Sequence, residues 1–193
     1  MSYQYIIRNN RRIRPFTKNI ILTHVPNLIE THHIMPDSIT HNNYFTVGTM
    51  EKYFMESLKK DMLPYHYYID NVFEDWYIFK GMREMQPSYF IEDLVSAGVI
   101  EYQYLHSIVI AISDDYSRYT LDTRMSEQMV SKLITDLFRR YKLHFDHLFY
   151  IDECLHENWE ENLNTSELKY KYKLGTYFDK DILIRDINKF HIN

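Results

Sequence analysis

The run Ser107 to Ile112, SIVIAI, constrains the fold more than any other segment of this chain. Its apolar residues occupy both odd and even positions, so both faces of a strand formed here have to be covered. This pattern is typical of a central strand that lies between two layers of helices. Asn19 to His24, NIILTH, is a short β-branched run that also predicts a buried strand. The two runs indicate a layered α/β structure.

Three further segments have the composition of strands. Tyr65 to Asp70, YHYYID, and Asp75 to Lys80, DWYIFK, are aromatic and β-branched runs separated by a short polar turn. This arrangement predicts a hairpin. His147 to Ile151, HLFYI, predicts another strand.

Helical periodicity is clearest from Thr123 to Tyr141, where apolar residues recur along one stripe. An earlier helix is predicted to begin after an N-cap at Thr49 and to end at Pro64. A short C-terminal helix is predicted to begin after Asp179, which caps it. The stripe of the long helix consists of Val130, Leu133, Ile134, Leu137, Phe138 and Tyr141.

These elements predict one α/β domain over residues 1–193, with a central mixed sheet of about five strands flanked by helices. The sequence contains 4 Gly and 5 Pro, and no run of them forms a linker between two domains. Residues 1–18 are predicted to be an N-terminal extension, and the polar residues 153–172 are predicted to be an insertion.

Composition argues against several functional classes. The chain has 22 Lys and Arg against 27 Asp and Glu, and its basic residues are scattered, so nucleic acid is a poor candidate partner. The single cysteine, Cys154, excludes an internal disulfide framework and a thiolate zinc knuckle. The N-terminal residues contain no long apolar run, so we expect neither a secretory signal nor membrane insertion. We therefore expect the protein in the cytoplasm of the producing cell.

The order of the predicted elements resembles that of a known family, the zinc-dependent type 2 N-acetylmuramoyl-L-alanine amidases. These enzymes share a fold with the phage amidase lysozymes and the peptidoglycan recognition proteins. The resemblance rests on the order and spacing of short pieces across most of the chain. The similar pieces are NIILTH at Asn19 to His24, PYHYYID at Pro64 to Asp70, WYIFKGMRE at Trp76 to Glu84, HSIVIAI at His106 to Ile112, the helix from Thr123 to Tyr141, and KLGTYFD at Lys173 to Asp179.

The resemblance implies a zinc site of which only part is present. His24 stands where the family places its first zinc-binding histidine. Tyr65 matches a tyrosine that assists the zinc-bound water in some members, and Lys173 matches a lysine that stabilises charge on the scissile amide. The position of the second histidine corresponds to Asp152, and that of the third ligand corresponds to Gly175, which has no side chain. The resemblance therefore implies a degenerate metal site.

A shifted ligand set is one alternative. Asp152, Cys154 and His156 occupy alternating positions, so in an extended chain their side chains share one face, and all three residue types can bind zinc. His24 with two of them would complete a site. Plainer interpretations stay open as well: His24 as a hydrogen-bonded rim histidine, Tyr65 as a core tyrosine and Cys154 as a lone buried cysteine.

We expect a degenerate amidase-like module of phage or mobile-element origin that holds no cofactor and serves in binding or assembly. Its partners would be a peptidoglycan fragment or other protein subunits, and a phage virion is one place where it would act. The first alternative is an active zinc-dependent peptidoglycan amidase in which His24 and a shifted ligand pair hold the metal, with Tyr65 and Lys173 assisting hydrolysis. The second alternative is a protein-interaction domain that is unrelated to cell walls.

Overall fold

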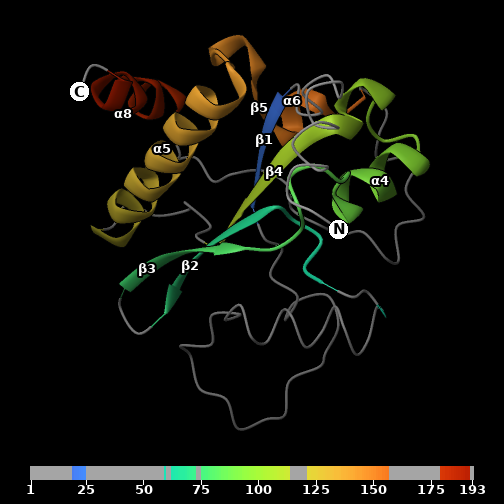
Figure 1. The fold of residues 1–193 in the computed structure, drawn as a ribbon, viewed down its shortest axis with the longest axis horizontal. Helices are drawn as coiled ribbons and strands as arrows, with labels where there is room; N and C mark the ends of the chain where they lie inside the picture. The colour runs from blue at the N-terminus through green and yellow to red at the C-terminus, as the bar shows by residue number, and fades with distance from the viewer. Residues whose placement is uncertain are drawn as a thin grey trace, which may run out of the picture.

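A computed structural model of the chain describes residues 19–24, 59, 62–72, 75–113, 121–156 and 179–191. Its centre is one five-stranded sheet in the order β3-β2-β4-β1-β5. Helices α5 and α8 lie on one side of this sheet, and α4 lies on the other (Figure 1). The strands are β1 (Asn19–His24), β2 (Tyr67–Val72), β3 (Asp75–Lys80), β4 (Ser107–Ile112) and β5 (Leu148–Tyr150).

The sheet is mixed, as predicted. β1 pairs in parallel with β4 and with β5, and β4 pairs in parallel with β2. β2 and β3 form the predicted antiparallel hairpin. All six residues of β4 are buried, which confirms that it is a central strand covered on both faces. The prediction of an α/β fold built on five strands is confirmed.

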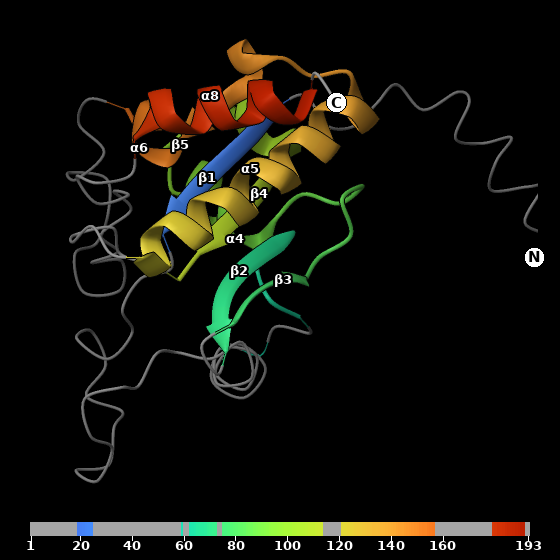
Figure 2. The same ribbon diagram turned by 90° about the vertical axis from the view of Figure 1, so that its left-hand side faces the viewer.

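One face of the sheet is covered by α5 (Leu121–Tyr141) and α8 (Lys180–His191). Figure 2 shows both helices in front of β1 and β4. Asp179 caps α8, because its Oδ1 accepts hydrogen bonds from the backbone N–H of Asp181 at 2.8 Å and of Ile182 at 3.3 Å. The long helix and the capped C-terminal helix are therefore confirmed. The core on this side contains Ile20, Leu22, Ile69, Ile108, Ile110, Val130, Ile134, Leu137, Leu183 and Ile187.

The opposite face is covered by α4 (Tyr89–Ser96), a helix that our sequence analysis missed. Ser88 caps it by accepting a hydrogen bond from the N–H of Ile91 at 3.4 Å, and its hydroxyl donates to the carbonyl of Pro64 at 2.6 Å. The short 3-10 helix η1 (Tyr102–His106) then leads into β4. The core on this side contains Ile21, Tyr65, Tyr68, Ile91, Leu94, Val99, Ile100, Val109, Ala111, Ile151 and Cys154.

The chain around β5 turns helical earlier than predicted. The 3-10 helix η2 (Phe145–His147) precedes β5, and α6 (Ile151–Cys154) begins at the residue that follows it. The predicted strand from His147 to Ile151 is therefore three residues long. None of the helices in the described ranges is long and apolar enough to cross a membrane. Most of the predicted helix between Thr49 and Pro64, the extension 1–18 and most of the insertion 153–172 lie outside the described residues.

Candidate functional sites

The carboxyl ends of the parallel strands form the first candidate site. β1, β4 and β5 run in the same direction, so their carboxyl ends meet at one edge of the sheet. His24 is the last residue of β1, and its backbone pairs with Ile112 at the end of β4. On the other side, Leu22 pairs with Tyr150, two residues before Asp152. The topology thus places the first two predicted ligand positions at neighbouring strand ends.

The three residues of the proposed shifted ligand set do not share one face. They were expected to do so in an extended chain, but α6 is a helical turn in which Asp152 is exposed and Cys154 is buried. Glu153 favours this turn, because its Oε2 accepts a hydrogen bond from the N–H of Tyr150 at 2.8 Å. His156 is exposed beyond the turn, and its backbone N–H donates to the carbonyl of Val99 at 3.0 Å. The extended arrangement is therefore wrong.

Cys154 has the environment of a core residue. It is 4% exposed, and its Sγ donates to the carbonyl of Tyr150 at 3.6 Å. Burial raises the pKa of the Cys154 thiol to about 12, and a hydrogen bond with Tyr104 only partly opposes this increase. Such a thiol is neither a ready nucleophile nor a ready metal ligand. Within the described ranges, no three His, Cys, Asp or Glu side chains are arranged to hold a metal ion.

Tyr65 lies in the core beneath α4. It is 3% exposed, and its ring packs against Phe90 with the two ring centroids 5.4 Å apart. Its carbonyl accepts a hydrogen bond from the N–H of Met82 at 2.9 Å, and a Cβ on Gly81 would lie 2.3 Å from the same oxygen. The chain therefore needs glycine at 81 to return this close to Tyr65. The side chain of His24 and the whole of Lys173 and Gly175 lie outside the described residues, so their roles stay predictions.

His66 is a fully buried polar residue that sequence reasoning missed. Its Nδ1 accepts a hydrogen bond from the N–H of Val109 at 3.0 Å, so the ring proton has to be on Nε2, which donates to the carbonyl of Gln86 at 2.9 Å. Burial lowers the pKa of His66 despite the hydrogen bond to Gln86 and the nearby charge of Glu84. The ring is therefore a neutral link between β4 and the segment after β3.

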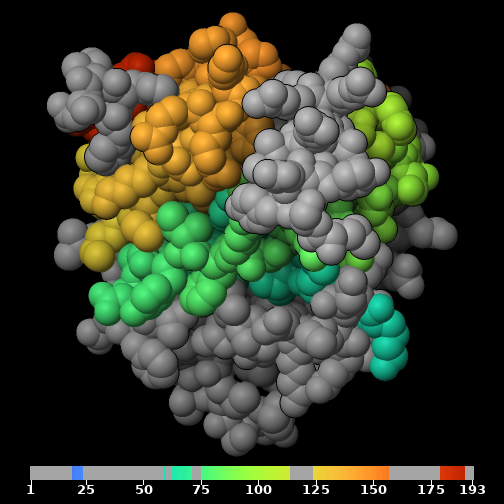
Figure 3. All heavy atoms as spheres, in the orientation of Figure 1, coloured from blue at the N-terminus to red at the C-terminus, as the bar shows by residue number. Residues whose placement is uncertain are grey.

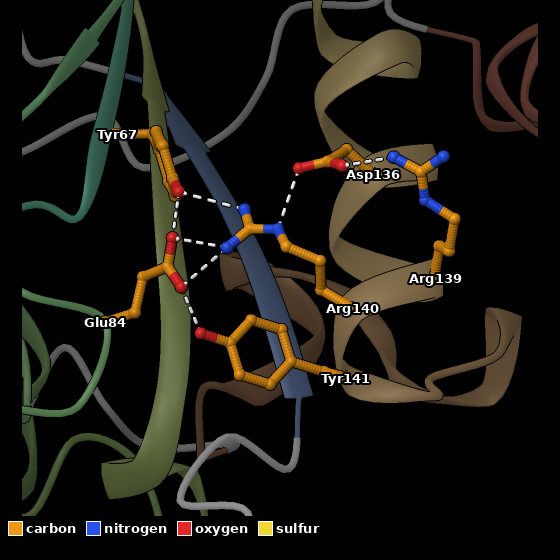
Figure 4. Close-up of polar contacts among 6 residues, drawn as sticks. All are labelled: Tyr67, Glu84, Asp136, Arg139, Arg140 and Tyr141. Carbon is orange, nitrogen blue, oxygen red and sulfur yellow. Dashed lines mark hydrogen bonds and ion pairs between the residues drawn. The ribbon is translucent and has the colours of Figure 1, made fainter. Parts of the chain in front are cut away.

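The second candidate site is a polar network between the hairpin side of the sheet and the last turns of α5 (Figure 4). The Glu84 carboxylate accepts hydrogen bonds from the hydroxyls of Tyr67 and Tyr141. Arg140 Nη1 donates to both Glu84 oxygens, at 2.9 and 2.8 Å, and its Nη2 donates to the Tyr67 hydroxyl at 3.1 Å. Arg140 Nε donates to Asp136 Oδ2 at 2.7 Å, which completes the guanidinium's contacts shown in the figure.

The members of this network shift one another's pKa values. Burial by itself raises the pKa of Glu84, but hydrogen bonds from Tyr141, Tyr67 and Arg140 outweigh it and hold the pKa below its usual value. Burial and the Glu84 carboxylate raise the pKa of Tyr67 to about 12, and they also raise that of Tyr141. No member of the trio Glu84, Tyr67 and Tyr141 is thus tuned to exchange a proton near neutral pH. The network is suited to holding β2 against α5, not to acid–base chemistry.

A buried carboxylate, Glu127, lies near the other end of α5. Its side chain is 2% exposed, and Arg124 Nη1 is 3.5 Å from its Oε2. Arg124 also reaches Asp186 of α8, with Nη2 3.2 Å from Oδ2, so one guanidinium is shared by two acids. Glu127 Oε1 is buried and has no hydrogen-bond partner among the described residues. Burial raises the pKa of Glu127, and Arg124 only partly opposes this increase.

Comparison with known proteins adds no family to these observations. A scan against models of protein families finds no match to the chain. A search of curated proteins also finds no significant match. The proposal for function therefore rests on the sequence and on the geometry of the first candidate site, at the carboxyl ends of the parallel strands.

Proposed function

We propose that this chain is a degenerate amidase-like module that binds a peptidoglycan fragment, or another subunit of an assembly, without hydrolysing a substrate. The proposal takes up the resemblance to the zinc-dependent amidases, which implies a mixed sheet of about five strands flanked by helices. The observed sheet is compatible with that expectation. A phage or mobile-element origin, with a place in the virion, belongs to the same proposal.

The observation that carries the proposal is that β1, which ends at His24, and β5, which ends two residues before Asp152, are neighbouring parallel strands. In the resemblance, His24 and Asp152 are the first and second ligand positions, and parallel strand ends are where binding sites of open α/β sheets lie. The third ligand position is Gly175, which has no side chain to offer. The module would thus keep the place of the site without the full ligand set.

Two ligands are too few for the chemistry. A catalytic zinc ordinarily has three protein ligands and one open position for water, and bound water becomes acidic enough to attack only when the metal is held. Cys154 is a poor substitute ligand because its thiol is buried with a raised pKa. The loss of the third ligand therefore favours binding over hydrolysis.

An active zinc amidase is the alternative that the same strand ends favour. His24, Asp152 and the exposed His156 would then hold the zinc, which would supply an activated water. Lys173 would steady the charge that develops on the amide oxygen. Tyr65 would not orient that water, because it is 3% exposed and precedes β2, toward the end of the sheet opposite His24. This alternative needs Asp152 of α6 and His156, which follows α6, to approach His24.

Metal content distinguishes the degenerate module from the active zinc amidase. We would measure zinc by elemental mass spectrometry on protein purified without chelator or a histidine tag, as wild type, as His24→Ala and as His144→Ala. His144 is an exposed histidine outside the candidate site and serves as the matched control. We expect far less than one zinc per chain, with no change in either variant. About one zinc per chain, lost in His24→Ala and kept in His144→Ala, would contradict the degenerate site.

Binding and hydrolysis can be measured on the same samples. We expect wild-type protein to sediment with insoluble peptidoglycan and to release no new amino groups from it. Sedimentation with release of amino groups would favour the active amidase. Absence of sedimentation would remove the peptidoglycan partner and leave a role in assembly.

A further inference from the structure

The two ends of the sheet differ in how they are protected. β5 forms one end and has three residues, and short edge strands offer little for another chain to pair with. β3 forms the other end and has six residues, a length of about 20 Å. Within the described part of the chain, β3 pairs only with β2, so one row of its backbone N–H and C=O groups faces away from the sheet.

β3 lacks the features that usually block pairing at an edge. Its sequence is DWYIFK, with its charges at the two ends and four aromatic or aliphatic residues between them. Each residue pairs in turn with β2, from Asp75 with Val72 to Lys80 with Tyr67, so no bulge bends the strand. Charged residues, prolines and bulges in the middle of an edge strand are the common ways to prevent association. The middle of β3 has none of these.

The middle of β3 is also exposed. Tyr77 is 46% exposed and Ile78 is 36% exposed, and these two residues lie on opposite faces of the strand. Figure 3 shows the hairpin at the surface below α5, as green spheres at the lower left. Side chains on both faces of β3 are therefore exposed in its middle.

We propose that β3 pairs antiparallel with β3 of a second copy of this chain, so that one sheet continues across a two-fold axis. This axis has to be perpendicular to the sheet, because only then do the two strands run in opposite directions within one sheet. Such an axis keeps each side chain on its own face. Residues that lie opposite each other must therefore be separated by an even number of positions.

One register suits the sequence best. With Ile78 opposite Ile78 of the second copy, Tyr77 lies opposite Phe79, and Trp76 lies opposite Lys80. These are an aliphatic pair, two aromatic pairs and two pairs of a cation with an aromatic ring, and like charges do not meet. In the neighbouring register, centred on Tyr77, Asp75 would lie opposite Phe79, which leaves the carboxylate beside an apolar ring.

This self-complementarity favours a second copy over an unrelated extended peptide. Asp75 and Lys80 also cancel in charge, so two copies of the strand do not repel each other. The inference stands apart from the proposed function, because it uses neither the strand ends at His24 nor any zinc or peptidoglycan.

Sedimentation velocity over a range of concentrations tests the inference. We expect a reversible dimer for the wild type and an increase of at least about tenfold in the dimer dissociation constant for Ile78→Lys, which brings two like charges into opposition. Tyr102→Lys is the matched control, because Tyr102 is a 69% exposed aromatic residue on η1, away from β3. A wild type that stays monomeric at every concentration, or an Ile78→Lys variant that dimerises as strongly as the wild type, would overturn the inference.

Cross-linking tests the register and covers the case in which Ile78→Lys folds poorly. In a Cys154→Ala background, Ile78→Cys should form an intermolecular disulfide under mild oxidation, because the two side chains lie opposite each other. Tyr102→Cys in the same background should not. Equal cross-linking by both variants, or by neither, would count against pairing through β3.

Discussion

Glu84, which is partly buried, and Glu127, which is buried, are carboxylates near opposite ends of α5, and each is beside an arginine. Their pKa values nonetheless move in opposite directions, down for Glu84 and up for Glu127. Glu84 has two tyrosine hydroxyls and a guanidinium that contacts both of its oxygens. Glu127 shares one arginine with Asp186 and has one unpartnered oxygen among the described residues. The number of hydrogen-bond donors therefore decides the direction in which each of these two pKa values moves.

The difference also assigns structural roles to the two ends of α5. The network around Glu84 ties the helix to β2, whereas Arg124 ties it to α8. We expect the network around Glu84 to contribute more to stability than the contacts of Glu127. Removing any one of its members would leave another group of the network without a hydrogen bond. Four substitutions test this comparison.

The largest effect is expected for Arg140→Met, which removes the cation from Glu84. The side chain of Glu84 is 9% exposed, so its charge would lose its main partner in a poorly solvated position. We expect the free energy of unfolding in urea to fall by about 3 kcal/mol. Arg139→Met is the control, because its ion pair with Asp136 is exposed and should be worth less than about 0.5 kcal/mol. Equal losses in the two variants would contradict the role of the network.

The next effect is the pH dependence of Glu84→Gln. The folded pKa of Glu84 is below its unfolded value of 4.5, so its charged form stabilises the protein above pH 4.5, and this contribution is lost as the pH falls through the folded pKa. The wild type should exceed Glu84→Gln by about 2 kcal/mol at pH 7, with the gap closing below pH 4.5. Urea unfolding of both proteins at each pH measures this difference in the free energy of unfolding. Because both proteins contain His66, its contribution cancels in the difference. A difference that grew as the pH fell would contradict a lowered pKa of Glu84.

A smaller loss is expected for Tyr141→Phe. The substitution removes one hydrogen bond to Glu84 and keeps the ring, so the free energy of unfolding should fall by about 1.5 kcal/mol. Tyr102→Phe, at a 69% exposed position, should change it by less than about 0.5 kcal/mol. Thermal unfolding followed by circular dichroism would rank the two variants, and an equal rank would mean that the Tyr141 hydroxyl contributes nothing.

The smallest effect is expected for Glu127→Gln, and its pH dependence has the opposite sign. The folded pKa of Glu127 is above 4.5, so ionisation costs stability as the pH rises from 4.5 through the folded pKa. The variant should match the wild type within about 0.5 kcal/mol below pH 4.5 and should gain on it as the pH rises. Urea unfolding over the same pH series as for Glu84→Gln gives the measurement. A variant that lost stability as the pH rose would show that Glu127 is satisfied by further partners.

Local patterns in the sequence were enough to predict most of the elements. A few neighbouring residues are enough to predict each of four features: the apolar run of β4, the apolar stripe of α5, the hairpin of β2 and β3, and the cap of α8. Residues that recur with the period of a helix or strand record which face is buried, whatever covers that face. This is why the fold class followed from the sequence alone.

The tertiary structure decided which distant residues meet. Glu84 and Arg140 are 56 positions apart in the sequence, and His66 and Val109 are 43 positions apart. No local spacing of residues therefore predicts either contact. The turn of α6, which separates Asp152 from Cys154, begins directly after the last residue of β5 that pairs with β1. The periodicity of apolar residues indicates which face of an element is buried. Which residues contact one another depends on the register of the strands and on how each helix packs on the sheet. Those are properties of the assembled chain, because they are set by contacts between elements that lie far apart in the sequence.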